Sequence, residues 1–435
     1  MTTDNGQRVT TPPENQYINR TVLNNGIVLL VAENPAADII AARIFVQAGS
    51  CWEQREQAGL AHLLSAVLTK GTQELSSLEI AERVESVGAS LSTDAAADYF
   101  LLSLKTVSAD FAEILELGGQ ILRSPSFPEV EVELERRLAL QAIRSQQEQP
   151  FTIAFDGLRQ AMYQNHPYAM SGLGTEATVA NLNRTDLQQY HQTYFRPDNI
   201  VISIAGRVTL AAAAALVEQV FGDWQAPPTP LPVLTLPTPT HQPKRTITPQ
   251  QTQQSIVMLG YLAPSVQNAD YTALKLLSTY LGNGLSSRLF VELREKRGLA
   301  YEVSAFYPTR QDVATFVVYM GTAPENTEIA IKGLRTEVEL LCSSQLNEVA
   351  LQAAKNKLLG QYALGKQTNA QIAQVFGWYE TLGLGIAFDT QFQEAVTSIT
   401  TAELQQAACQ YFLEPYASLV GPESAINSLA APAGT

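Results

Sequence analysis

Histidine and cysteine, the residues that most often bind metals or form disulfides, are scarce in this chain: its 435 residues include 4 His and 3 Cys. The cysteines Cys51, Cys342 and Cys409 lie far apart and form no CxxC pair. Their spacing argues against a cysteine-based zinc site, and their odd number argues against a disulfide framework. Charged residues make up only 16% of the chain, whereas hydrophobic residues make up 46%, which is typical of a folded protein with large cores.

Basic residues are outnumbered: 28 Lys and Arg against 42 Asp and Glu give a net charge of −14. Binding to nucleic acid requires a basic surface, so the sequence predicts no nucleic-acid partner. An acidic surface would attract basic peptides, but it is also the ordinary charge of a soluble protein. No apolar run approaches the roughly 18 residues of a membrane span, and the polar start "MTTDNGQRVTTPPENQ" has no signal-peptide core. We therefore expect a cytoplasmic protein without membrane contact.

Proline is concentrated in one segment. Seven of the chain's 22 prolines lie in "APPTPLPVLTLPTPTHQP", residues 226–243, where they exclude helix and favour an extended connection. Since 435 residues exceed one simple core, the sequence predicts two domains joined here. The predicted organisation is a disordered tail at 1–15, an N-terminal half at 16–225, a linker at 226–246, a C-terminal half at 247–423 and a tail at 424–435.

The two halves resemble each other near their ends. "DLQQYHQTYF" (186–195) and "ELQQAACQYF" (403–412) match at Leu, Gln, Gln, Tyr and Phe, and each precedes a strand-like apolar run. The coarse order of elements repeats as well, which indicates a duplicated unit.

Local patterns predict the elements within each half. "INRTVLNNGIVLLVAE" is typical of a β-hairpin around an Asn-Gly turn, and Ser76 and Glu79 form a capping box for a helix ending near Gly88. Strands and helices come in separate runs, which predicts an α+β fold: in each half, an antiparallel sheet with helices on one face.

The segment "GLAHLLSAVLTKGT" (59–72) is predicted to be a helix that carries His62. A zinc peptidase needs three ligands, an open position for water and a carboxylate base. In the motif H-x-x-E-H, the two His residues and the Glu lie close together on one helix face. Here the corresponding residues are His62, Ser65 and Ala66, so the base is replaced by serine and the second ligand by alanine.

The flanking residues carry a family resemblance. "AGSCWEQREQAGLAHLLSAVLTKGT" resembles the zinc-helix segment of the family of pitrilysin, insulin-degrading enzyme and mitochondrial processing peptidase, whose pattern is a Gly-Ser, an acidic residue, G-L-A-H-F-L-E-H and K-G-T. In "ERRLALQAIRS" the position matching the family's third ligand, a Glu, is Ala142 or, one residue earlier, Gln141. The resemblance extends over about residues 16–422 and implies two homologous halves that close into a clam-shell chamber.

In the second half, "LGNGLSSRLFVELREKRGLAYEVSAF" is similar to a signature of the family's bacterial and mitochondrial branch. In that family an Arg and a Tyr at the spacing of Arg294 and Tyr301 bind the substrate backbone at a zinc site formed by another half, and both side chains are strong donors for a developing oxyanion. The spacing alone fits equally a basic helix end followed by an ordinary strand aromatic. Gly298 is predicted to end the helix.

The Gly-rich start of the same segment, "LGNGLSSRLF", is not a phosphate-binding loop because it lacks GK[ST] and a preceding buried strand. We expect a turn between two helices, with Ser286 or Ser287 as the cap.

The resemblance therefore implies a non-catalytic, substrate-binding subunit of a heterodimeric zinc peptidase that cleaves peptides or presequences. This chain would bind no zinc and would be inactive alone; a partner chain of similar length with an intact H-x-x-E-H would hold the zinc. An alternative is a catalytically inactive homodimer that binds peptides or serves as a scaffold, in which Arg294 and Tyr301 are relics. A lone histidine such as His62 is also commonly an ordinary structural residue.

Overall fold

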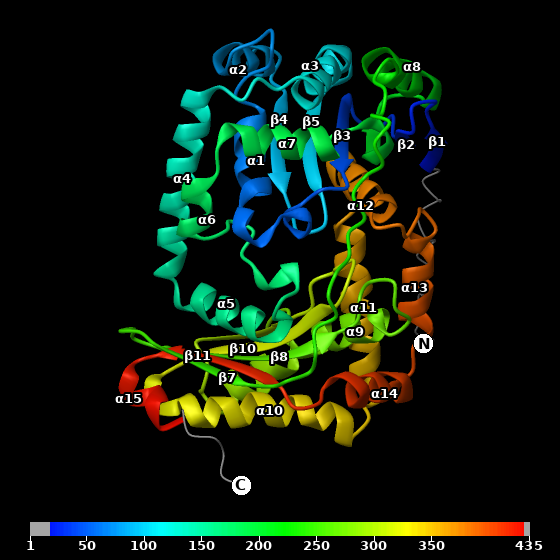
Figure 1. Cartoon of the computed structure of the whole chain (residues 1–435). Coiled ribbons are helices and arrows are strands. Elements are labelled where there is room, and N and C mark those ends of the chain that lie inside the picture. Colours follow the sequence, from blue (N-terminus) through cyan, green and yellow to red (C-terminus); the bar gives the residue numbers. More distant parts are fainter. Residues whose placement is uncertain (1–17, 430–435) are drawn as a thin grey trace, which may run out of the picture.

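Two β-sheets organise the chain, one in each half (Figure 1). The computed structural model describes residues 18–429. The first sheet has the order β1-β2-β6-β3-β5-β4 and the second the order β7-β11-β8-β10-β9. The strands of the first sheet are β1 (Ile18–Val22), β2 (Val28–Glu33), β3 (Ile39–Val46), β4 (Ser90–Ala95), β5 (Phe100–Val107) and β6 (Ile200–Gly206). Those of the second are β7 (Arg245–Pro249), β8 (Ser255–Ala263), β9 (Glu302–Phe306), β10 (Ala314–Thr322) and β11 (Tyr416–Gly421).

Helices lie between and around the sheets. In the first half they are α1 (Leu60–Leu68), α2 (Ser77–Ser86), α3 (Phe111–Arg123), α4 (Glu129–Gln147), α5 (Pro150–Tyr163), α6 (Glu176–Asn181), α7 (Arg184–Tyr194) and α8 (Leu210–Phe221). In the second half they are α9 (Tyr271–Leu281), the π-helix η6 (Phe290–Glu295), α10 (Thr327–Ser343), α11 (Glu348–Leu364), α12 (Asn369–Thr381), α13 (Phe388–Ser398), α14 (Thr401–Tyr411) and α15 (Glu423–Ile426). The α+β fold with two halves is confirmed.

The strand pairing repeats between the halves, in agreement with a duplication. In each sheet one parallel pair, β2 with β6 or β7 with β11, is followed by antiparallel neighbours in the corresponding order. The sheets are therefore mixed and not wholly antiparallel as predicted. The strands of a parallel pair need a long connection between them. Here β2 and β6 are separated by most of the first half, so no local sequence pattern indicates that they pair.

Helices cover both faces of each sheet, whereas the sequence predicted only one. The second face is covered by a helix from the opposite half: α5 packs on β8 and β11, and α12 packs on β3 and β6. In Figure 1, α5 lies directly above the second sheet. Apolar side chains such as Leu158 of α5 and Phe376 of α12 join these contacts in shared clusters. The halves are thus joined by a reciprocal exchange of helices.

Gly377 allows α12 to approach the first sheet closely. A Cβ atom added there would lie 2.4 Å from Cε2 of Phe45 and 2.9 Å from Cβ of Ser203. Phe45 is fully buried and cannot move aside easily. We expect Gly377→Ala to lower the free energy of unfolding by about 1–3 kcal/mol, as overpacking does, measured by urea denaturation.

Gly360 on α11 provides the matched control. It is exposed, and an added Cβ would meet nothing within 4 Å. Gly360→Ala should therefore raise the free energy of unfolding by roughly 0.5–1 kcal/mol through helix propensity. Equal effects of the two substitutions would contradict the close packing of α12 on the sheet.

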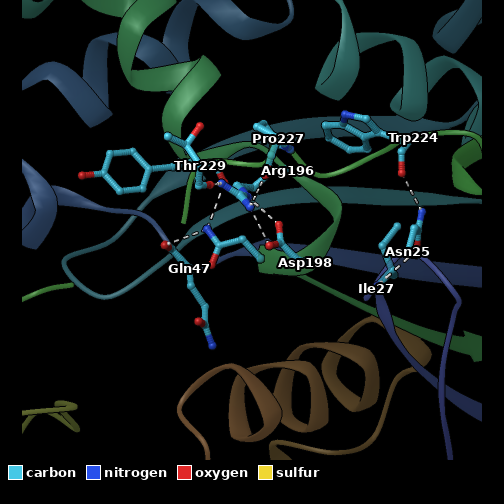
Figure 2. A network of polar contacts seen from close by, with 10 residues as sticks. Asn25, Ile27, Gln47, Arg196, Asp198, Trp224, Pro227 and Thr229 are labelled. Carbon is cyan, nitrogen blue, oxygen red and sulfur yellow. Dashed lines mark hydrogen bonds and ion pairs between the residues drawn. The ribbon is translucent and has the colours of Figure 1, made fainter. Parts of the chain in front are cut away.

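The proline-rich linker runs without helix or strand to β7, which begins at Arg245, inside the range predicted as linker. Its start is held by the buried Arg196, whose guanidinium donates to the carbonyls of Pro227 (3.1 Å) and Thr229 (2.6 Å) and pairs with Asp198 (Figure 2). Near its end, the hydroxyl of Tyr416 donates to the carbonyl of Thr240 at 3.0 Å. These contacts fasten the linker to both halves.

At its C-terminal end the structure differs from the predicted organisation. The second half extends beyond 423, because α15 and its buried Ile426 pack on the second core where the sequence predicted a tail. The tail predicted at 1–15 lies outside the described residues. No helix in the described part of the chain is long and apolar enough to cross a membrane.

Local predictions hold well. β1 and β2 form the expected antiparallel hairpin around Gly26, which has a φ of 98°. Ser76 and Glu79 form the capping box at the start of α2. The turn at 282–287 joins two helical segments as predicted, but the predicted serine cap is wrong: no side chain caps η6, and the buried hydroxyl of Ser287 has no hydrogen-bond partner within residues 18–429.

Candidate functional site

The helix α1, which carries His62, is fixed at its start by a buried carboxylate. Glu53 accepts hydrogen bonds from the backbone N–H groups of Gly59 (3.0 Å) and Ala61 (2.6 Å), so it caps the helix from outside the usual cap position. Burial raises the pKa of Glu53 to about 8, against the lowering effect of these two hydrogen bonds. The acidic residue of the family pattern thus has a structural role, which the sequence analysis missed.

Ser65 and Ala66 are the residues that the family resemblance predicts at the positions of the base and the second ligand. Ser65 is buried, and its hydroxyl donates to the carbonyl of His62 at 2.7 Å, one turn back along the helix. The carbonyl of Ser65 accepts from the hydroxyl of Thr93 on the edge strand β4 at 2.6 Å. The serine therefore serves local helix contacts, and the methyl group of Ala66 has no donor atom for a metal.

His62 is partly buried, and two carboxylates lie close to it. Burial lowers the pKa of His62 below its ordinary value, while the nearby Asp94 and Glu135 oppose this shift. Glu135, on α4, is already paired with Lys70 at 2.9 Å. Ala142 also lies on α4, which packs against α1.

The donor set at this helix does not suit zinc. His62 supplies one imidazole, whereas the other three positions carry a hydroxyl and two methyl groups, and Gln141, the alternative to Ala142, is an exposed amide. Among residues 18–429 no three His, Cys, Asp or Glu side chains are grouped so that they could hold a metal ion.

The remaining histidines have structural partners. His166 Nδ1 accepts from the N–H of Tyr168, His191 bonds the carbonyl of Leu122, and His241 bonds the carbonyl of Glu414. The three cysteines, all in the described part of the chain, are free thiols.

Arg294 and Tyr301 lie on the surface of the second half. Arg294 is on the last turn of η6, and its guanidinium lies 4.9 Å from the centre of the Phe290 ring. Gly298, with a φ of 63°, ends the helical segment, since its N–H bonds the carbonyl of Arg294 at 3.0 Å. Tyr301 follows immediately before β9 and is 64% exposed.

The donor groups of both side chains are unpaired in the described part of the chain. Across residues 18–429, no hydrogen bond or ion pair joins the side chain of Arg294 or Tyr301 to another residue, although neighbouring charges are paired: Lys296 with Glu292 (2.8 Å) and Arg297 with Glu337 (3.4 Å). Arg294 and Tyr301 lie in the second half and the His62 helix lies in the first half, and each half has its own sheet. Two strong donors are thus available to a ligand or to another chain.

Comparison with known proteins gives the family. The model "Insulinase (Peptidase family M16)" matches residues 28–176, and the model "Peptidase M16 inactive domain" matches residues 181–358. An uncharacterized zinc protease, YmxG, from Bacillus subtilis is 26% identical over 413 residues, which cover 94% of this chain and all of that protein. An uncharacterized zinc protease from Rickettsia felis is 24% identical and covers 94% of this chain and 98% of its own length.

Solved structures share the fold. A protease from Helicobacter pylori superposes with a TM-score of 0.90 at 22% identity and covers 94% of this chain and 100% of its own. A peptidase M16 inactive domain from Pseudomonas fluorescens superposes with a TM-score of 0.86 at 24% identity and covers 93% of this chain and 98% of its own. Fold and sequence together define a metallopeptidase-like protein with two homologous halves. The chain belongs to the insulinase, or M16, peptidase family.

Proposed function

We propose that this chain is the non-catalytic, substrate-binding subunit of a heterodimeric, cytoplasmic zinc peptidase that cleaves peptides or presequences. One contrast carries the proposal: the positions of the zinc chemistry lack the required donor atoms, whereas Arg294 and Tyr301 are exposed and their side chains form no hydrogen bond or ion pair within residues 18–429. A purely structural role would not require an Arg and a Tyr with available donor groups at the spacing that the family resemblance assigns to substrate binding.

The first part of the proposal is that zinc belongs to the partner. One imidazole cannot hold a catalytic zinc ion, which takes three protein ligands. Ser65 cannot replace a carboxylate as the base for a metal-bound water, because an ordinary serine hydroxyl is far less basic. The partner chain would supply an intact H-x-x-E-H and the third Glu.

The second part is that Arg294 and Tyr301 act across the interface. A guanidinium and a phenolic hydroxyl donate strong hydrogen bonds, and in a closed, dry chamber such donors stabilise charge that develops on a carbonyl oxygen. In this chain both side chains are exposed and belong to the segment that leads from η6 to the edge strand β9. In the pair they would contact the substrate at the partner's zinc site.

The edge strand β9 offers a place for the peptide backbone. β9 is outermost in the second sheet, where it pairs with β10 on one side. An extended peptide commonly binds by adding a strand to such an edge. Because Tyr301 directly precedes β9, a peptide added there would place a carbonyl near the phenol.

The proposal is tested by mild affinity purification of the tagged chain from its own cells, with co-purifying chains identified by mass spectrometry. We expect a stoichiometric partner of similar length with H-x-x-E-H, and peptidase activity in the pair but in neither chain alone. Recovery of the chain as a homodimer without such a partner would overturn the proposal in favour of an inactive peptide-binding or scaffolding protein.

A further inference from the structure

The second half contains a cavity of about 490 Å³ between α9, α11, α12, α13 and the end of β9. This volume lies within the range of small-ligand pockets. Aromatic side chains form much of its wall, among them Tyr271, Phe306, Tyr307, Trp378, Phe388 and Phe392. The walls thus suit an apolar or aromatic ligand.

The pocket lies beside the helix of the second half that corresponds to the His62 helix of the first. α1 packs against the edge strand β4 and the helices α4 and α7, and α9 packs in the same way against the edge strand β9 and the helices α11 and α14. α9 is therefore the counterpart of α1, and the C-terminal half of α11, which lines the pocket, is the counterpart of the part of α4 that carries Ala142. The pocket therefore lies at the place in the second half that corresponds to the surroundings of His62 and Ala142 in the first.

Lys275 of α9 supplies the pocket with a positive charge. Its ammonium donates one hydrogen bond, to the carbonyl of Tyr307 at 2.7 Å, and lies over the rings of Tyr271 (5.6 Å) and Tyr307 (5.4 Å). An ammonium has three donors, so two remain available. No carboxylate within the described residues forms an ion pair with Lys275, and burial lowers the pKa of this lysine to about 8.

A second lysine at the pocket already forms an ion pair with a carboxylate of the chain. Lys366 pairs with Asp389 at 2.7 Å and lies over the ring of Tyr362 at 4.2 Å. Asp389 also accepts from the hydroxyl of Tyr362 (2.7 Å) and from the amide of Gln393. This carboxylate is therefore fully engaged, and Lys275 is left as the uncompensated cation.

We propose that this pocket binds the carboxylate of an apolar or aromatic acid, with the carboxylate on Lys275 and the apolar body against the aromatic walls. A buried charge is costly unless it is paired, and a ligand carboxylate would pair it while the rings cover the rest of the ligand. The same chemistry is offered by a free small acid and by the C-terminal residue of a peptide. The proposal is independent of the proposed function, because it requires neither zinc nor a partner chain.

Calorimetric titration of the full chain tests the pocket with N-acetylphenylalanine and its uncharged amide. We expect the acid to bind and the amide to bind about tenfold to a hundredfold more weakly, the effect of losing one charged hydrogen bond. Equal binding of acid and amide, or binding of neither, would overturn the proposal. This comparison uses the wild-type chain and so needs no variant to fold.

Variants locate the site. Lys275→Met should weaken binding of the acid by a similar factor. Lys357→Met is the control and should leave the affinity unchanged. Lys357 is a neighbouring lysine that donates to the carbonyls of Thr279 and Gly282 and is absent from the pocket walls. Unchanged affinity in a folded Lys275→Met chain would refute the assignment. Tighter binding of a short peptide that ends in phenylalanine would identify the peptide C-terminus as the source, and equal or weaker binding would identify the free acid.

Discussion

Replacing Arg294 by Ala or Tyr301 by Phe is expected to lower kcat of the reconstituted pair by about one to three orders of magnitude, the range for lost oxyanion donors. The expected loss is in kcat because these donors act on charge that develops only in the transition state. Both side chains are exposed and bond no other residue of the described chain, so their removal should leave the fold intact. Steady-state kinetics with a peptide substrate, with circular dichroism for the fold, measures the effect.

Lys296→Ala is the matched control. Lys296 lies at the same helix end, is exposed and pairs with Glu292 at 2.8 Å. Its removal takes away a positive charge at the surface without touching Arg294, and kcat should change little. Turnover that is unaffected by both Arg294→Ala and Tyr301→Phe would eliminate the proposed role of the pair.

Acidification is expected to destabilise the fold through His191, a buried residue of α7. Burial lowers the pKa of His191 to about 4, against an ordinary value of 6.5. The unfolded chain therefore binds a proton first as the pH falls. The stability that neutral His191 contributes is fully present above pH 6.5 and is lost as the pH falls towards 4, by about 3 kcal/mol in total.

Urea denaturation between pH 7 and pH 4 measures this loss in the wild type and in His191→Gln. The variant should lose less stability over this range, by about 3 kcal/mol, because it has no imidazole to protonate. At neutral pH the variant should be less stable than the wild type, since His191 stacks on Phe195 and bonds the carbonyl of Leu122 at 2.8 Å. Identical pH dependence of the wild type and His191→Gln would contradict the account.

Features that depend on a few neighbouring residues were predictable from the sequence. The Asn-Gly hairpin before β2 and the capping box at Ser76 both formed as expected, because their energetics are decided within a single turn. The repeated segments at 186–195 and 403–412 form the helices α7 and α14, which pack against the corresponding helices α1 and α9. Gly298, as a residue suited to end a helix, also predicted that Arg294 lies at a helix end and Tyr301 at the start of the following strand region.

Long-range packing was not predictable. α5 and α12 each cover the sheet of the other half, yet their sequences show only helices with apolar residues, which do not identify the surface they pack on. Glu53 looks like a surface residue until the fold brings it under the start of α1. Lys275 likewise became a pocket residue only because α11, α12 and α13 close around α9.

The central claim is that zinc belongs to the partner and not to this chain, and zinc content measures it directly. The purified chain is dialysed against buffered zinc, alone and with its partner, and bound metal and peptidase activity are determined. The account predicts no stoichiometric zinc and no activity in the chain alone, and one zinc ion with activity in the pair. Stoichiometric zinc in the chain alone, lost on His62→Ala, would contradict it.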